Sequence, residues 1–304
     1  MKKLEKEAVL KERMILVGAV SFFIFILPYI LHLAINGIQP AMNEDVGGIE
    51  QTIRVDVDGR TVSICLESYL VGALARSTEP EYMDETLKAV AVILRSNAVC
   101  AITEERPVAR ESFYTDAQLR ILWGVEYENN IQRYQDAVKT TEGIVIFYGG
   151  EIVEVPFHKI SAGETRDGEI LAPYLPYVKS VSSAEDMYAN GYYVTMKIEG
   201  EILGEDFTIL SQDRLGYALA VKVKGKELSG EEFCRKYGLP SACFEYDKKE
   251  EDYVFYVRGK GHGFGLSIYG ADALAGKGRS FGEILQYYYP GIEIRKENRE
   301  EIHA

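Results

Sequence analysis

The pattern of hydrophobic and polar positions is most informative at residues 67–101, where it predicts two buried elements joined by a polar corner. Apolar residues recur at helical spacing through the second half of this stretch, and most remaining positions there are apolar too. Such a pattern is typical of a helix buried on all sides. The first element, residues 68–76, is small and apolar. Between them stand residues that begin or cap helices: Ser77, Thr78, Glu79, Pro80 and Glu81.

One charged residue, Arg95, lies within the predicted buried helix. A charge without a partner is costly in a protein interior, so Arg95 requires a carboxylate or another anion. Two interpretations follow. Arg95 forms a structural ion pair, or it belongs to a functional site, where perturbed charges gather.

Alternating apolar and polar residues predict antiparallel hairpins on both sides of this helix. One hairpin surrounds Asp58-Gly59 and a second surrounds Gly149-Gly150. The fold class is therefore α+β: a mixed domain of antiparallel hairpins packed around buried helices, with one N-terminal transmembrane helix. The other predicted elements are helices at 128–140 and 229–237, strands at 192–198, 218–224 and 253–258, and a helix that begins near Ser267.

The N-terminal region predicts a membrane anchor. Residues 14–35 form an apolar run of 22 residues, and a helix of that length is about 33 Å long, enough to cross a hydrocarbon core. A cleaved signal peptide is the alternative, but its apolar region has only about 7 to 15 residues. Basic residues precede the run and acidic residues follow it, which places the N-terminus in the cytoplasm and the domain outside. The predicted organisation is a cytoplasmic tail (1–13), a transmembrane helix (14–35), a linker (36–51), a folded domain (52–291) and a C-terminal tail (292–304).

Composition narrows the classes of function. A net charge of −13 argues against a general nucleic-acid binder, whose affinity would come from neutralising phosphates. The four cysteines show no zinc-type spacing, so we expect no metal. We also expect no cofactor. Buried thiols are the default for these cysteines. A disulfide between one pair stays possible outside the cytoplasm. These cysteines are Cys65, Cys100, Cys234 and Cys243.

Two histidines are candidate site residues. Residues 259–271 carry glycines at alternate positions around His262, a pattern that fits neither a strand nor a dinucleotide or P-loop motif. It predicts a tight turn, which either packs beneath the following helix or forms a site loop. His158 stands at the head of the polar loop 157–167 and is either a hydrogen-bonded structural residue or a ligand-binding one.

Several of these motifs resemble the stage II sporulation protein D family, which has the SpoIID/LytB domain. The resemblance covers roughly residues 53–291 and rests on residues 68–97, GHGFGLSIYGA, the stretch 226–244 and the closing FGEILQYYYPG. It implies a membrane-anchored lytic transglycosylase of cell wall remodelling, a lyase that cleaves peptidoglycan glycan strands between N-acetylmuramic acid and N-acetylglucosamine. It further implies action in sporulation, during forespore engulfment at the mother-cell membrane, with stage II sporulation proteins P and M as partners. A single glutamate suffices for this chemistry where burial raises its pKa.

The sequence departs from the family pattern at the polar corner. Without gaps, the family's catalytic glutamate falls on Ser77, and Glu79 is the nearest carboxylate. The resemblance implies Glu79 and Arg95 as catalytic residues. It implies Ser77, Asp116, Gln118, His158, His262, Ser267 and Tyr269 as substrate-binding residues.

Whether the chain is an enzyme stays uncertain on the sequence. Besides the transglycosylase, a weak or inactive family member could bind glycan strands and stimulate a partner amidase. The two functions differ at Ser77, because a serine has no proton to donate at neutral pH. A single groove lined by Glu79, Arg95 and His262 would favour the enzyme.

Overall fold

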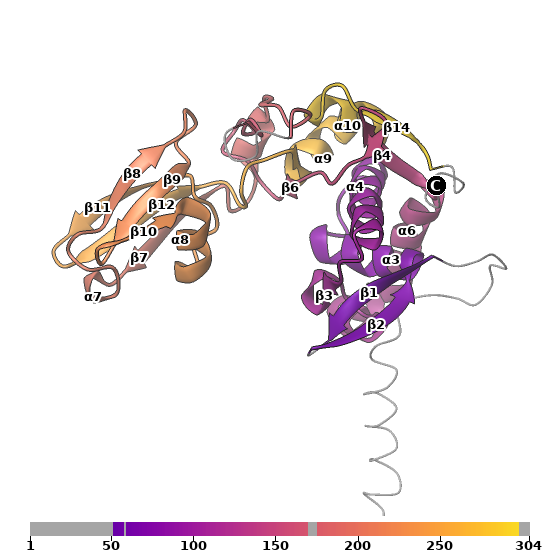
Figure 1. Cartoon of the computed structure of the whole chain (residues 1–304), viewed down its shortest axis with the longest axis horizontal. Helices are drawn as coiled ribbons and strands as arrows, with labels where there is room; N and C mark the ends of the chain where they lie inside the picture. Colours follow the sequence, from indigo (N-terminus) through magenta and orange to yellow (C-terminus); the bar gives the residue numbers. More distant parts are fainter. Residues whose placement is uncertain (1–50, 58, 170–174, 298–304) are drawn as a thin grey trace, which may run out of the picture.

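The computed structural model describes residues 51–297, except residue 58 and residues 170–174. Two hydrophobic cores define two lobes. Figure 1 shows the lobe of strands and α8 apart from the lobe that contains α4, with extended segments running between them. The predicted transmembrane helix, 14–35, and the linker, 36–51, lie outside the described residues.

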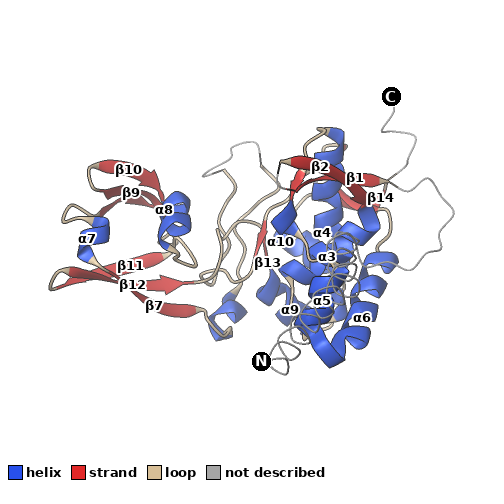
Figure 2. Ribbon diagram, turned by 90° about the horizontal axis from the view of Figure 1, so that it is seen from below, coloured by secondary structure: helices blue, strands red, loops and turns tan. Residues whose placement is uncertain are grey.

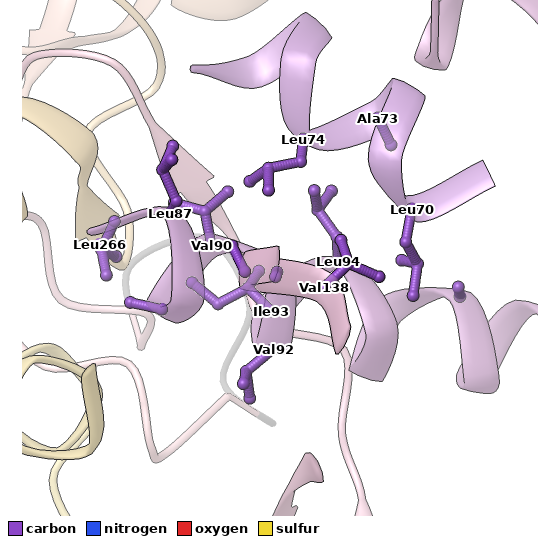
Figure 3. Packing of buried hydrophobic residues seen from close by; sticks show 14 of the residues in the cluster. Leu70, Ala73, Leu74, Leu87, Val90, Val92, Ile93, Leu94, Val138 and Leu266 are labelled. Carbon is purple, nitrogen blue, oxygen red and sulfur yellow. The ribbon is translucent and has the colours of Figure 1, made fainter. Parts of the chain in front are cut away.

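The first lobe is organised around α4 (Asp84–Thr103), the predicted buried helix. Its neighbours α3 (Leu66–Ser77) and α6 (Tyr127–Thr140) pack against it. Figure 3 shows Leu74 of α3, Leu94 of α4 and Val138 of α6 among the side chains of this core. Among the described helices, α4 alone is long and apolar enough to cross a membrane, but 67% of its apolar window is buried inside the protein. It is therefore the core helix that the sequence predicts.

Short sheets and further helices surround these three helices, and Figure 2 shows α3, α4 and α6 together on one side of the molecule. The first predicted hairpin is β1 with β2, and the second is β4 with β5. Two strand pairs are parallel, β1 with β3 and β6 with β13. The strands of this lobe are β1 (Thr52–Val57), β2 (Arg60–Cys65), β3 (Val108–Ala109), β4 (Ile144–Tyr148), β5 (Glu151–Ile152), β6 (Phe157–His158), β13 (Leu266–Ser267) and β14 (Glu293–Lys296). The remaining helices are α5 (Asp116–Trp123), α9 (Ile268–Gly276) and α10 (Phe281–Tyr288), with 3₁₀ turns η2 (Arg110–Ser112), η3 (Gly124–Glu126) and η4 (Ala184–Tyr188).

The second lobe is a small antiparallel unit with an aromatic core. Phe207, Phe233 and Phe255 pack together at its centre. Its two sheets have the strand orders β10-β9-β8 and β11-β12-β7. Its elements are β7 (Tyr193–Ile198), α7 (Gly200–Leu203), β8 (Thr208–Gln212), β9 (Ala218–Val223), β10 (Lys226–Ser229), α8 (Gly230–Tyr237), β11 (Phe244–Lys249) and β12 (Asp252–Arg258).

A buried arginine joins the second lobe to the segment that leads into it. The Arg166 side chain is fully buried and forms ion pairs with Asp213 at 2.7 Å and Glu231 at 2.6 Å. Its guanidinium also donates to His262 O at 3.0 Å. The two carboxylates compensate the buried charge, as such a position requires.

The mixed α+β class is confirmed, as are both hairpins and the helices at α6 and α8. Ser229 caps α8 through a capping box, and Ser267 caps α9, which agrees with the helix starts expected from the sequence. The prediction of antiparallel hairpins is incomplete, because β1 pairs with β3 and β6 pairs with β13 in parallel. β14 pairs with β4 and lies within the segment predicted as a C-terminal tail.

Candidate functional site

A cavity of about 600 Å³ opens at the corner between α3 and α4. Its wall combines segments that lie far apart in the sequence: the end of α3, the corner itself, Tyr114, the end of α5, and Lys159. Two aromatic side chains, two cations and several carboxylates line it. These residues include Arg76, Glu79, Glu81, Tyr114, Trp123 and Lys159.

The corner is fixed by hydrogen bonds on both sides. At the end of α3, the buried Thr78 donates through Oγ1 to Leu74 O at 2.7 Å. Arg133 of α6 donates to Pro80 O and Tyr82 O. On the other side, Asp272 of α9 accepts from Met83 N at 2.7 Å. The backbone that carries Glu79 is thus tied to three other helices.

Glu79 lines the cavity with an exposed side chain. The half-buried Tyr82 lies close enough to Glu79 for the carboxylate charge to affect the pKa of its phenol. Burial first, and the Glu79 and Asp272 carboxylates second, raise the pKa of the Tyr82 phenol well above its usual range. The burial that the sequence argument requires of a single catalytic glutamate is not provided by the protein around Glu79.

The cavity depends on close packing at Gly72. A Cβ at this position would lie 2.2 Å from Tyr114 O, so only glycine lets this loop rest on α3. Tyr114 N donates to Gly72 O at 3.1 Å. The loop is thereby held where the Tyr114 ring lies under the Arg76 guanidinium, 5.1 Å from ring centre to Cζ, within the range of a cation–π contact.

Trp123 also lines the cavity. Its ring packs on Tyr134 of α6 with centroids 5.1 Å apart, and Tyr134 is fully buried. The indole is therefore held by the core while it lines the cavity. Leu122 and Glu126 extend the wall on either side of it.

Lys159 enters the cavity from the segment after β6. Its carbonyl accepts from Tyr269 N at 3.1 Å, at the start of α9, which fixes its backbone. Burial lowers the pKa of the half-buried ammonium. The charges of Lys260 and Arg76 lower this pKa further, while Glu79 opposes them.

Arg95 has a complete set of partners outside this cavity. Its side chain is 1% exposed and pairs with Glu67 at 2.8 Å. It also donates to Thr141 O at 2.7 Å and Val138 O at 2.9 Å. The structure thus gives Arg95 the surroundings of a structural ion pair, and the carboxylate that it binds is Glu67 rather than Glu79.

The buried His158 and the half-buried His262 form a pair away from the cavity wall. Their ring centroids are 5.6 Å apart. His158 Nδ1 lies 3.0 Å from Phe264 O, and because a carbonyl only accepts, this nitrogen carries the proton. His262 Nδ1 accepts from Phe264 N at 3.1 Å. Burial lowers both pKa values, that of His158 to about 3, so both rings are neutral at pH 7.

The other predicted binding residues have structural contacts. Ser77 donates to Ala73 O at 2.8 Å within α3. Asp116 pairs with Arg120 at 2.8 Å, and Gln118 completes the capping box that starts α5. Ser267 donates to the buried Asp186 at 3.0 Å, and the backbone of Tyr269 anchors Lys159.

Of the residues predicted for the site, only Glu79 lines the cavity. The three-residue groove of Glu79, Arg95 and His262 is not formed. The sequence argument did not assign Arg76, Glu81, Tyr114, Trp123 or Lys159 to the site, although Glu81 stands in the polar corner and Lys159 in the loop 157–167 that it singled out. Among the described residues, no group of three or more His, Cys, Asp or Glu is placed to hold a metal ion.

Comparison with known proteins supports the resemblance found in the sequence. The family model described as stage II sporulation protein matches residues 59–148, which include the polar corner and most of the cavity wall. The chain is 30% identical to stage II sporulation protein D of Bacillus amyloliquefaciens over 256 residues, which cover 76% of this chain and 74% of that protein. It is 29% identical to the protein of the same name from Bacillus subtilis (strain 168) over 260 residues, 76% of this chain and 75% of that protein. A shorter stretch of 47 residues, 16% of this chain and 7% of the relative, is 45% identical to an amidase enhancer of Bacillus subtilis (strain 168).

Proposed function

Since the chain belongs to the stage II sporulation protein D family, we propose that it is a peptidoglycan lytic transglycosylase with its glycan site in the cavity around Glu79. The observation that carries the proposal is the position of Glu79. It is the nearest carboxylate to the family's catalytic position, and it stands on a cavity wall between aromatic and charged side chains.

The wall has the chemistry that a glycan strand requires. Sugar rings present faces of C–H groups, against which the flat rings of Tyr114 and Trp123 can stack. The hydroxyl and acetamido groups of the sugars can hydrogen-bond to Glu81, Glu126 and Asn130, which also line the cavity. Because hydrogen bonds from other helices hold the corner, the backbone that carries Glu79 would be in place before the strand binds.

In the proposed reaction Glu79 acts as both acid and base. Its protonated carboxyl gives a proton to the glycosidic oxygen, and the bond from that oxygen to C1 of N-acetylmuramic acid breaks. The muramyl 6-hydroxyl then attacks C1 and returns its proton to Glu79, which closes the 1,6-anhydro ring without adding water. A general acid at neutral pH needs shielding from water. Glu79 is exposed, so the bound strand itself would supply that shielding.

A second function is favoured by two observations. The serine at the family's catalytic position is turned back onto Ala73, and part of the chain is similar to an amidase enhancer. In this alternative the same cavity binds glycan strands without cleaving them, and the protein stimulates a partner amidase.

The proposed setting is the cell envelope during sporulation. The chain would be held by its N-terminal segment in the mother-cell membrane, with the domain facing the forespore. Stage II sporulation proteins P and M would be its partners during engulfment.

The deciding experiment measures release of anhydro-muropeptides from peptidoglycan by the full-length protein and its Glu79→Gln variant. Because general-acid catalysis contributes about 10²- to 10⁴-fold in rate, Glu79→Gln should lower release by that factor while strand binding persists. Glu142→Gln is the matched control, since Glu142 is an exposed carboxyl that does not line the cavity. A wild-type protein that releases no anhydro product but accelerates an amidase would refute the transglycosylase and leave the binding function.

A further inference from the structure

The cavity wall carries two cations, Arg76 and Lys159. Arg76 donates to the Tyr114 hydroxyl at 3.1 Å and to Glu111 O at 3.4 Å. Within the part of the chain that the structure describes, neither Arg76 nor Lys159 forms an ion pair. Both therefore keep hydrogen-bond donors that can turn to a ligand.

The buried cations elsewhere in the protein behave differently. Arg95 and Arg166 each bind a carboxylate within 2.8 Å. Lys159 is half-buried and is instead placed near two other cations, Lys260 and Arg76, whose charges lower its pKa. Positive charges near a half-buried ammonium group repel it, and an anion bound between Lys159 and Arg76 would relieve that repulsion.

The backbones of both residues are held in place. Lys159 is tied to the start of α9 through Tyr269. Arg76 belongs to the last turn of α3, and its guanidinium rests on the ring of Tyr114. Because these backbones are already held, less freedom is lost when the two side chains bind a ligand, which favours affinity.

The negative net charge of the chain gives the two cations of the cavity wall a role in admitting acidic ligands. A protein with net charge −13 repels acidic ligands over most of its surface, and a local positive spot is needed to admit one. Glu79 is exposed and stands beyond ion-pair distance of both cations, so it leaves them available.

We propose that Arg76 and Lys159 together bind a carboxylate of the glycan ligand and thereby determine which strands the cavity accepts. This inference rests on the proposed glycan site. A strand offers that carboxylate from two sources: the lactyl group of a bare N-acetylmuramic acid, or the amino acids of a stem peptide. Planar guanidinium and flexible ammonium groups both bind carboxylates through charge-assisted hydrogen bonds.

The test measures strand binding by Lys159→Met and Arg76→Met variants of the full-length protein, each in a Glu79→Gln background so that no strand is cleaved. Three probes are used: strands stripped of stem peptides, strands with intact stem peptides, and chitooligosaccharide, which carries no carboxylate. Each variant should bind one carboxylated probe about 10- to 100-fold more weakly, with chitooligosaccharide binding changed less than about twofold. The carboxylated probe that loses affinity identifies the source of the carboxylate.

Lys159→Arg should restore most of the affinity, because it returns the charge. Lys260→Met is the control, since Lys260 is a nearby exposed cation that does not line the cavity. Equal losses for chitooligosaccharide and the carboxylated strands, or no loss at all, would overturn the assignment while the glycan site stands. If the parent protein binds none of the probes, the proposed function fails and this inference fails with it.

Discussion

Replacing Arg95 should destabilise the protein without acting directly on glycan binding. The guanidinium lies at the C-terminal end of α6, where it donates to Val138 O and Thr141 O. Carbonyls at a helix end lack partners within the helix and carry partial negative charge. Arg95 therefore closes α6 onto α4 from inside the core, which is a structural task.

The magnitude follows from these contacts. Thr141 O also accepts from Ile144 N and Val138 O from Thr141 Oγ1, so each lost bond should cost about 1 kcal/mol, near the low end for a buried acceptor. Glu67 is 32% exposed, and water would solvate its carboxylate after the substitution. The loss of this ion pair should therefore lower the free energy of unfolding by about 1 kcal/mol or less. Arg95→Met keeps the aliphatic stem and should cost about 3 kcal/mol, at the low end for a broken buried pair.

Thermal and urea unfolding of the full-length protein would measure this loss. A cost of about 3 kcal/mol corresponds to a fall in Tm of about 6 to 12 °C for a domain of this size. Arg279→Met is the matched control: Arg279 is exposed and pairs with Glu283 one helical turn away, so its loss should cost less than about 0.5 kcal/mol. A cost below about 1 kcal/mol for Arg95→Met, or lost glycan binding at unchanged Tm, would refute the structural assignment and return Arg95 to the site.

Two further predictions concern pH and topology. His158 is neutral in the fold because burial holds its pKa near 3, so its contribution to stability is complete above about pH 6.5 and falls by about 1.4 kcal/mol per pH unit as pH drops toward 3. His158→Asn keeps a donor for Phe264 O and should flatten the pH dependence of unfolding by that amount, whereas identical slopes would contradict the assignment. If the N-terminal tail is cytoplasmic, protease added to intact protoplasts should remove the domain from residue 52 onward and leave a short membrane-bound fragment. A protected domain would reverse the orientation.

Local patterns in the sequence were sufficient to predict the helices of the first core, both hairpins and several other strands. The apolar character of α4 is visible within 20 residues, and each hairpin is marked by a turn between two adjacent strands. Capping residues such as Ser229 act within one helical turn. Signals of this kind do not depend on which distant segments meet.

The candidate site depends on contacts between distant segments, which is why the sequence identified so little of it. Arg95 needed a carboxylate, but its partner Glu67 lies 28 residues earlier in the chain, and no spacing rule selects it. Tyr114 reaches the cavity because Gly72 lets its loop rest on α3. Lys159 reaches it because α9 holds its carbonyl. None of these pairings leaves a periodic trace in the sequence.

The proposed catalytic residue, Glu79, is therefore better judged by its surroundings than by its alignment. Ser77 is the last residue of α3, and its hydroxyl is turned onto Ala73 O, so a side chain there follows the helix. Glu79, two residues later, stands on a corner that Arg133 and Asp272 hold from opposite sides. A backbone held by other helices gives a catalytic side chain a fixed point of attachment. Ser77 thus lies at a helix end, whereas Glu79 lies on a corner that other helices hold. A carboxylate at residue 79 stands on the wall that also carries Arg76, Trp123 and Lys159.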